Sequence, residues 1–238
     1  EYRAFLAARR GDTSGQPPEC AWNERFDPEL YDPTDPNFDD PDTHDKCGVQ
    51  TWAYLEAHPN QPAACVDFCD AFAYCSWAGK RLCGRAGADG TKVVRASTAP
   101  SGGYDADLFA QSFELYRACT QGGSTAYPYG DAASPGLCKD SQWLAAQGLD
   151  SMAVEPVGGQ CHGTESPYDQ LYDLAGSVSE WGNLSVPYGR VAVLNIERQH
   201  VADQAKCDTA FGWAGPSSLG PGLGIRCCAA ALFEGSER

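Results

Sequence analysis

The clearest amphipathic pattern in the chain lies in residues 66–78 (VDFCDAFAYCSWA). Its apolar positions share one helical face: Val66, Cys69, Phe72, Ala73 and Trp77. Asp67 stands where an N-cap residue is favoured, and Gly79 follows as the residue beyond the last turn. This segment is therefore predicted to be a helix. Weaker periodicity predicts two more helices, over 1–10 and about 107–118.

Residues 24–47 carry the opposite pattern, an acidic and proline-rich run without periodicity. Between Asp27 and Asp45, eight acidic residues are interrupted by four prolines. Each proline removes a backbone donor and disfavours helix in the residue before it, so a loop is predicted. Its carboxylates could bind Ca²⁺, but the EF-hand spacing is missing, which favours a solvated acidic loop. From Ser124 onward, frequent Gly and Pro predict short strands and ordered loops.

The charge balance excludes two classes of partner. The chain has 238 residues, and 17 Lys and Arg against 32 Asp and Glu give a net charge of −15. A nucleic-acid binder or a protein bound to an anionic membrane surface needs clustered cations, and no such cluster occurs. A nucleic-acid partner is therefore not expected. The chain also has no apolar span of about 20 residues, so no membrane span is expected.

Twelve cysteines indicate a disulfide framework, because so many are unusual in a reducing compartment. Structural zinc is disfavoured, since the chain has no C-x₂-C pair and its four histidines are scattered. The protein is therefore expected to be secreted, in an extracellular or periplasmic location. The sequence opens inside a predicted helix at Glu1, so a mature or trimmed product is expected.

Six segments form an ordered set of motifs: AYCSWAGKRLCG (73–84), ELYRACTQGG (114–123), YPYGD (127–131), PVGG (156–159), LYDLAGSVSEW (171–181) and LGIRC (223–227). Their order and spacing resemble the formylglycine-generating enzyme (sulfatase-modifying factor) family, and in particular its cysteine-rich, exported bacterial branch. The resemblance implies an α+β, C-type lectin-like fold with few helices, small twisted sheets, much irregular loop structure and many disulfides. It covers nearly all of 1–238, so a single domain is expected. The family's amino-terminal strands are missing before EYRAFLA, and self-assembly or another chain could supply that pairing.

The resemblance also implies disulfides at matching positions. Two pairs map directly: Cys75 with Cys227, and Cys119 with Cys207. Two further pairs are placed to close loops: Cys138 with Cys161, and Cys47 with Cys65. Four cysteines remain, with three possible connectivities: Cys20, Cys69, Cys83 and Cys228. Because Cys227 and Cys228 are adjacent, they are expected to take different partners.

A structural calcium site is implied by the D/N-x-x-G-x-x-x-E stretch of the family. The matching ligands are the side chains of Asp173 and Glu180 and the carbonyl oxygens of Gly176 and Val178. A hard cation prefers such oxygen ligands, and it would hold a loop that has no ladder of its own. The alternative interpretation is that the two carboxylates are ordinary surface groups.

Other candidate metal sites and ligand-groove residues have less support. The family's second calcium site would fall near 139–151, where Lys139 replaces the usual amide and only Asp140 and Asp150 supply carboxylates. Three polar residues cluster near the carboxy-terminal end: Glu197, His200 and Asp203. Such clusters are common in loops without binding metal. Three tryptophans could line a ligand groove or serve as buried anchors: Trp143, Trp181 and Trp213.

The catalytic part of the resemblance fails. Active members use two cysteines that bind Cu(I), and the corresponding positions here are Glu197 and Ala202. No cysteine occurs between Cys161 and Cys207, and the usual R-G-G-S motif is replaced at Val193, Leu194 and Asn195. Copper and catalytic residues are therefore not expected, since thiolates cannot be replaced by oxygen or aliphatic groups at a Cu(I) centre.

The sequence thus favours a secreted, non-catalytic module, stabilised by calcium and disulfides, that binds an unknown protein or glycan ligand or serves as a subunit of an extracellular assembly. The alternative is a copper-dependent formylglycine-generating oxidase that modifies a sulfatase cysteine. The candidate recognition surfaces are the segments 27–45, 85–105 and 190–206.

Overall fold

The computed structural model describes ten stretches of the chain. They are residues 1–27, 57–88, 91–95, 112–149, 157–159, 161–186, 190–194, 206–207, 211–220 and 222–229. Most of the acidic loop 24–47, including Cys47, lies outside these stretches, as does much of the segments 85–105 and 190–206.

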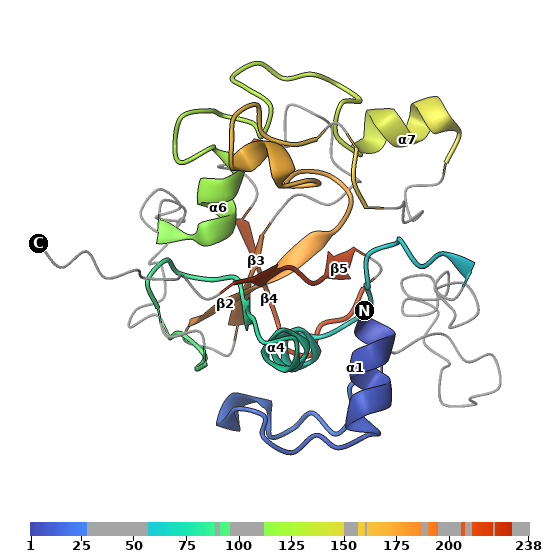
Figure 1. Ribbon diagram of the computed structural model, residues 1–238, viewed down its shortest axis with the longest axis vertical. Helices are drawn as coiled ribbons and strands as arrows, with labels where there is room; N and C mark the ends of the chain where they lie inside the picture. Colours follow the sequence, from blue (N-terminus) through green and yellow to red (C-terminus); the bar gives the residue numbers. More distant parts are fainter. Residues whose placement is uncertain are drawn as a thin grey trace, which may run out of the picture.

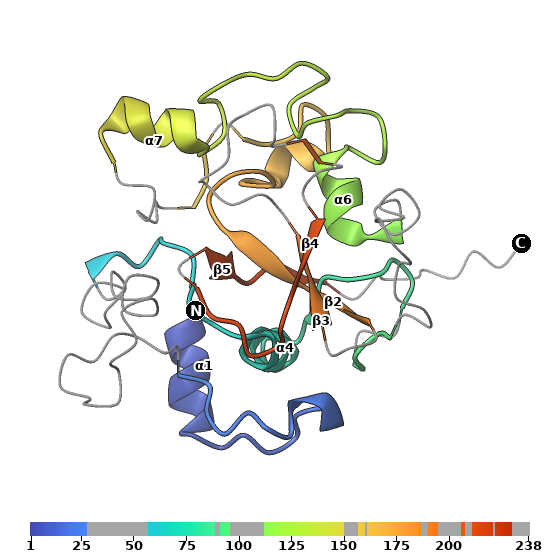
Figure 2. The ribbon, with the colours of Figure 1, turned by 180° about the vertical axis from the view of Figure 1, so that it is seen from behind.

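A four-stranded sheet with the order β4-β3-β2-β5 lies at the centre of the fold (Figure 1). Its strands are β2 (Ser179–Val186), β3 (Arg190–Leu194), β4 (Phe211–Ala214) and β5 (Leu223–Gly224). Strand β3 pairs antiparallel with both β2 and β4, whereas β5 runs parallel to β2. A separate antiparallel pair joins β1 (Arg81–Leu82) to β6 (Cys227–Cys228). Figure 2 shows the same sheet from behind.

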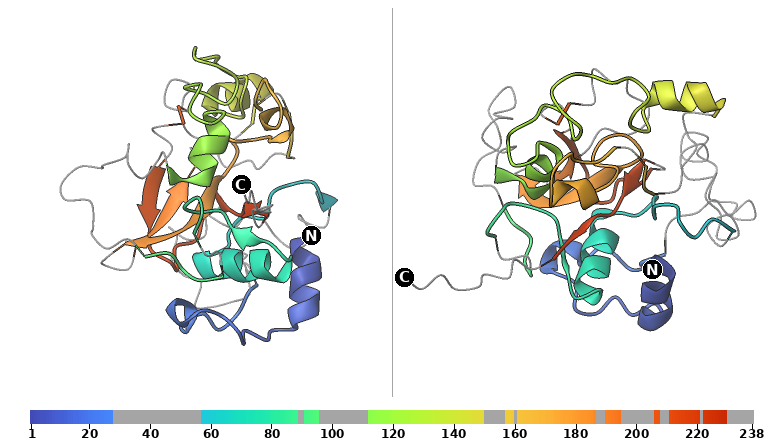
Figure 3. Two further views of the ribbon diagram at one scale, coloured as in Figure 1. Left: turned by 60° about the vertical axis from the view of Figure 1, so that its left-hand side comes forward. Right: turned by 45° about the horizontal axis from the view of Figure 1, so that its top comes forward.

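Helices lie on both sides of these strands. The described stretches contain α1 (Tyr2–Arg9), α4 (Phe68–Trp77), α6 (Glu114–Cys119) and α7 (Ser141–Gln147), with 3₁₀ turns at Pro18–Cys20 and Tyr168–Gln170. In Figure 1, α1 and α4 lie below the strands and α6 and α7 above them, and Figure 3 shows this arrangement from two further directions. None of the described helices is long and apolar enough to cross a bilayer.

Two of the predicted helices form close to their expected bounds. Residues 66–78 contain α4, whose first turn is closed by a capping box: the Asp67 side chain accepts from the Asp70 N–H at 2.9 Å, and the Asp70 carboxylate accepts from the Asp67 N–H at 3.3 Å. Beyond Trp77, Gly79 adopts the left-handed conformation with φ +68°. The predicted helix 1–10 corresponds to α1.

Of the third predicted helix, 107–118, residues 107–111 lie outside the described stretches, and its second half corresponds to α6 (Glu114–Cys119). Phe113 is extended and forms an isolated bridge with Arg85, so α6 begins only at Glu114. The Phe113 side chain is fully buried, and this tertiary packing outweighs the helical periodicity of its neighbours. Helix α7 has no counterpart among the predicted helices. Asp140 caps its first turn, and Gly148 ends it in the left-handed conformation.

The main core packs α1 and α4 against β2. Its largest buried side chains include Phe5, Phe26, Phe68 and Trp181. Trp181 donates its indole N–H to the Val66 carbonyl oxygen at 2.8 Å, and its ring meets Phe68 edge-on with centroids 6.2 Å apart. Trp181 is therefore a buried anchor and does not line a ligand groove.

Five disulfides between described residues link parts of the chain that are 23–152 positions apart in sequence. They are Cys20–Cys69, Cys75–Cys227, Cys83–Cys228, Cys119–Cys207 and Cys138–Cys161. Three of these pairs match the sequence-based pairing, and the other two assign the cysteines whose connectivity was open. Cys65 is also disulfide-bonded, while its predicted partner Cys47 lies outside the described residues. With few helices and small sheets, these bridges confirm the predicted α+β, disulfide-rich class.

Candidate functional site

The loop that leads into β2 carries the predicted calcium ligands. Asp173, Gly176 and Ser177 all have positive φ angles, of +56°, +73° and +62°. Position 176 requires glycine, because a Cβ there would lie 2.8 Å from the carbonyl carbon and oxygen of Lys139. The Ser177 N–H donates to that same carbonyl oxygen at 3.1 Å. The loop therefore lies directly against the backbone of Lys139.

Asp173 forms an ion pair inside this packed region. Its Oδ1 lies 3.1 Å from Lys139 Nζ, and the two side chains are only 8% and 11% exposed. Its Oδ2 accepts from the Gly158 N–H at 2.5 Å. The Asp173 N–H donates to the Cys161 carbonyl oxygen at 2.9 Å, and Cys161 is bonded to Cys138, the residue before Lys139. The disulfide thus holds both partners of the ion pair in place.

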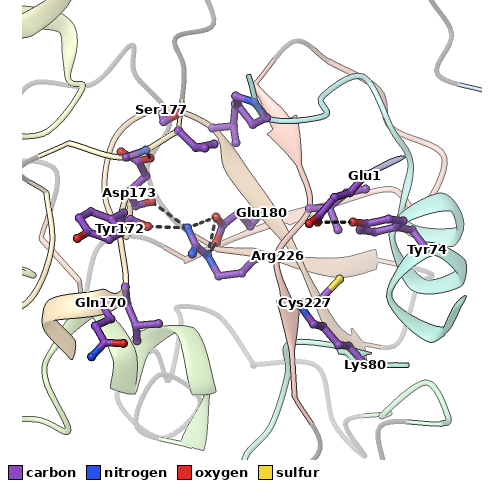
Figure 4. A pocket seen from close by; sticks show the side chains of 16 residues that line it. Glu1, Tyr74, Lys80, Gln170, Tyr172, Asp173, Ser177, Glu180, Arg226 and Cys227 are labelled. Carbon is purple, nitrogen blue, oxygen red and sulfur yellow. Dashed lines mark hydrogen bonds and ion pairs between the residues drawn. The ribbon is translucent and has the colours of Figure 1, made fainter. Parts of the chain in front are cut away.

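Glu180 forms a second ion pair with Arg226. Arg226 Nε donates to both carboxylate oxygens, at 2.8 and 2.9 Å, and Nη2 lies 2.7 Å from Oε1. Nη2 also donates to the carbonyl oxygens of Tyr172 and Asp173, at 3.0 and 3.3 Å (Figure 4). The guanidinium therefore binds a carboxylate and two carbonyl oxygens at once.

Burial sets the electrostatics of this second pair. The Glu180 side chain is 5% exposed, and burial raises the pKa of its carboxyl, although the positive charge and hydrogen bonds of Arg226 oppose this. Burial acts to lower the pKa of Arg226, but the attraction of Glu180 outweighs it and the pKa is raised. Arg226 therefore remains cationic, and its charge is matched to a buried carboxylate.

The two carboxylates among the predicted calcium ligands are engaged by protein groups in this structure. Ca²⁺ takes about six to eight oxygen ligands at roughly 2.3–2.6 Å. Both oxygens of Asp173 already face Lys139 or Gly158, and both oxygens of Glu180 accept from Arg226. The calcium site stays a prediction of the family resemblance, and protein cations lie beside its two carboxylates.

A cleft of 530 Å³ opens beside the Glu180–Arg226 pair (Figure 4). Three of its lining side chains are apolar and well exposed: Val157 at 59%, Tyr172 at 43% and Leu171 at 36%. The Arg226 side chain is 26% exposed, and its hydrogen bonds to described residues use Nε and Nη2. Arg226 also lines the cleft, which therefore combines exposed apolar side chains with a charged group.

The remaining sequence-predicted residues do not gather at this cleft. Asp140 is 2% exposed and accepts N–H groups at the start of α7 and from Gly136, so both its oxygens are engaged. Trp143 is half-buried on α7. Several candidates lie outside the described residues: Asp150, Glu197, His200, Ala202 and Asp203. The side chain of Trp213 is not described either.

Sequence reasoning did not single out Arg226. It belongs to the LGIRC segment, so its motif was found, but its contact with Glu180 joins residues 46 positions apart. A signal was nevertheless present. Arginine is always charged, and the half-buried LGIRC segment places it beside two disulfide-bonded cysteines, so a carboxylate partner could have been sought in LYDLAGSVSEW.

A further buried carboxyl group lies at the start of α4 and does not line the cleft. Asp70 is 3% exposed and accepts from Asn23 Nδ2 at 3.1 Å as well as from the Asp67 N–H. Burial, reinforced by the negative charge of Asp67, raises the pKa of Asp70 to about 8. Its hydrogen bonds serve the helix cap and the contact with Asn23.

Comparison with known proteins places this fold in a family. The sequence model of one protein family, described as the sulfatase-modifying factor enzyme 1-like domain, matches residues 36–231. Among solved structures, PvdO from Pseudomonas aeruginosa is similar with a TM-score of 0.46 and 18% identity, over 70% of this chain and 60% of the PvdO chain. The chain thus spans 60% of the length of PvdO. CarF is similar with a TM-score of 0.43 and 15% identity, over 75% of this chain and 70% of CarF.

A comparison with curated proteins finds no match. The family model nevertheless covers well over half of the sequence, including the motifs quoted above. The chain therefore belongs to the sulfatase-modifying factor enzyme 1-like domain family, which is the formylglycine-generating enzyme family.

Proposed function

We propose that this chain is a non-catalytic member of its family, a binding module that acts outside the cytosol. One observation carries the proposal. The two positions that correspond to the family's copper-binding cysteines are Glu197 and Ala202, and no cysteine lies between Cys161 and Cys207. Cu(I) requires soft thiolate ligands, and neither a carboxylate nor a methyl group can replace them.

The bonding of the other cysteines supports this proposal. Every cysteine in the described stretches takes part in a disulfide. Cys227, which lines the cleft, is bonded to Cys75 across the core. A disulfide sulfur cannot act as a thiolate ligand, so the described part of the cleft offers no copper site.

The cleft beside Arg226 is the proposed binding site. Exposed Tyr172 and Val157 offer apolar surface for packing, and the guanidinium of Arg226, which lines the cleft, offers a positive charge. Ligand sites commonly combine a mostly apolar lining with a few convergent polar groups. This combination suits a protein segment or a glycan that bears both an apolar face and a hydrogen-bond acceptor.

The disulfide content supports a secreted protein, extracellular or periplasmic, because disulfides persist in oxidising compartments. The bridges also give the domain a rigid scaffold on which loops can vary. Recognition through loops on such a scaffold does not depend on the lost catalytic centre.

An activity assay tests the loss of catalysis directly. The full chain is loaded with copper and incubated in air with a cysteine peptide of the sulfatase type, and the product is followed by mass spectrometry. We expect no conversion to formylglycine above the protein-free background. Turnover that requires copper and scales with the concentration of this chain would restore the oxidase alternative.

A binding assay tests the site. Glycan and peptide arrays are probed with the wild type, with Tyr172→Ala and with Trp22→Ala as a matched control. Trp22 has nearly the same exposure, 42% against 43%, but does not line the cleft. We expect Tyr172→Ala to lose binding that Trp22→Ala retains. Equal loss in both variants, or no binding by the wild type, would contradict the assignment.

A further inference from the structure

The two carboxylates among the predicted calcium ligands are matched by two cations from other segments of the described structure. Asp173 and Glu180 supply two carboxylates, while Lys139 and Arg226 supply two cations within 3.1 Å of them. The carboxylate side chains are 8% and 5% exposed. A buried carboxylate is costly unless hydrogen bonds or an opposite charge compensate it, and here protein cations contribute to that compensation.

The position of Lys139 is built into the fold. Its backbone forms an isolated bridge with Gly176, and glycine permits this close approach. Cys138, the residue before Lys139, is disulfide-bonded to Cys161, and the Cys161 carbonyl oxygen accepts a hydrogen bond from the Asp173 N–H. The backbones of Lys139 and Asp173 are thus fixed relative to each other, which places the ammonium group within reach of the carboxylate.

Arg226 binds the same kinds of atoms that a hard cation would bind. Its guanidinium contacts the carboxylate of Glu180 and the carbonyl oxygens of Tyr172 and Asp173. A divalent ion at this loop would have to displace these hydrogen bonds and approach two fixed positive charges. Both effects oppose calcium binding.

We infer that Lys139, beside the Glu180–Arg226 ion pair, takes the place of the calcium ion expected from the family resemblance, and that this loop and the cleft beside it are held together without metal. The inference concerns how the loop is stabilised. It does not depend on the loss of copper or on the ligand of the cleft.

Thermal unfolding in millimolar CaCl₂ and in EDTA tests this inference on the full chain. The wild type is expected to shift by less than about 1 °C between the two buffers, because a ligand stabilises a protein only by binding its folded state. Calorimetric titration with CaCl₂ is expected to show no saturable binding. A saturable, calcium-dependent rise in melting temperature that Glu180→Gln abolishes would overturn the inference.

Substitution of Lys139 separates cation replacement from simple packing. Lys139→Met keeps the length and apolar stem of the side chain but removes its charge. It is expected to melt several degrees lower than Lys80→Met, a control at an exposed lysine of the cleft rim. CaCl₂ is expected to recover part of that loss, because Asp173 regains a need for a cation. A loss that CaCl₂ does not recover would show that Lys139 acts through packing alone and would refute its role as a replacement.

If Lys139→Met does not fold, the wild-type calcium titration decides the matter alone. Activity and array binding are separate readouts, so failure of this inference leaves the proposed function standing.

Discussion

Two neighbouring disulfides allow the most detailed test of how the scaffold is stabilised. Cys75–Cys227 and Cys83–Cys228 have sequence separations of 152 and 145, and their partners at one end are adjacent residues. Strand β6 consists of these two adjacent cysteines, and it pairs with β1 just before Cys83, with Leu82 opposite Cys227. The perturbation is to remove each bridge by Cys→Ala at both of its ends, and then to remove both bridges.

The expected magnitudes follow from the loops that each bridge closes. When one bridge is intact, forming the other closes only a small ring, which runs from Cys75 to Cys83 and from Cys227 to Cys228. This ring has about nine residues, so loss of either bridge alone should lower the free energy of unfolding by about 2.6 kcal/mol in the chain-entropy model. With both absent, the first to form closes a path of about 57 residues, shortened by Cys119–Cys207, which is worth about 4.2 kcal/mol. Loss of both should therefore cost about 6.8 kcal/mol, about 1.6 kcal/mol more than the sum of the single losses.

Urea denaturation of the four proteins, with the other bridges left oxidised, measures this coupling. Packing defects left by alanine contribute to the single and double variants alike and cancel in the cycle. A stabilising osmolyte in all four samples keeps the double variant folded. Additive losses, or a single loss as large as about 4.2 kcal/mol, would refute the reasoning that the two bridges constrain the same part of the unfolded chain.

Three further predictions concern the charges and the loop. Arg226→Gln should cost about 3–5 kcal/mol because it leaves Glu180 buried without its partner, and adding Glu180→Gln should recover much of that loss in urea denaturation; no recovery would contradict the pairing. Burial raises the pKa of Asp70 to about 8, so this group binds its proton more tightly in the folded state. Its contribution to stability is therefore full below about pH 4 and is lost as pH rises toward about 8, with a slope of up to roughly 1.4 kcal/mol per pH unit. Asp70→Asn should flatten the measured dependence, and an unchanged slope would show that another group is responsible. Gly176→Ala should cost about 3 kcal/mol or more, against about 1 kcal/mol for Gly148→Ala. Both residues have left-handed φ angles, but only at Gly176 would a Cβ meet backbone at 2.8 Å, and equal losses would rule out the close approach.

Local sequence signals predicted the parts of the fold that depend on local interactions. Helix α4 was predicted because its apolar stripe, the Asp67 cap and Gly79 all act within one segment. The α+β, disulfide-rich class followed from motif order together with the cysteine count. Helix α7 carried comparable signals in Asp140 and Gly148, but its seven residues are too few for a periodic pattern to stand out.

Features that depend on contacts distant in sequence were harder to predict. Phe113 lies in a segment of helical periodicity, yet its pairing with Arg85 makes it extended. The resemblance directed attention to Asp173 and Glu180 as calcium ligands, whereas their cationic partners come from segments 34 and 46 residues away. Lys139 was noticed as an unusual residue in a different site, but no periodicity or spacing rule links it to Asp173. Only tertiary structure brings these charges together.

The central claim is that the cysteines of this chain hold the scaffold and leave no thiol pair for copper. Alkylation of the full chain, denatured but not reduced, followed by intact mass spectrometry tests that claim most directly. We expect none of the twelve cysteines to be alkylated and the mass to be unchanged. A mass increase corresponding to two alkylated thiols would contradict it and would make a copper centre possible again.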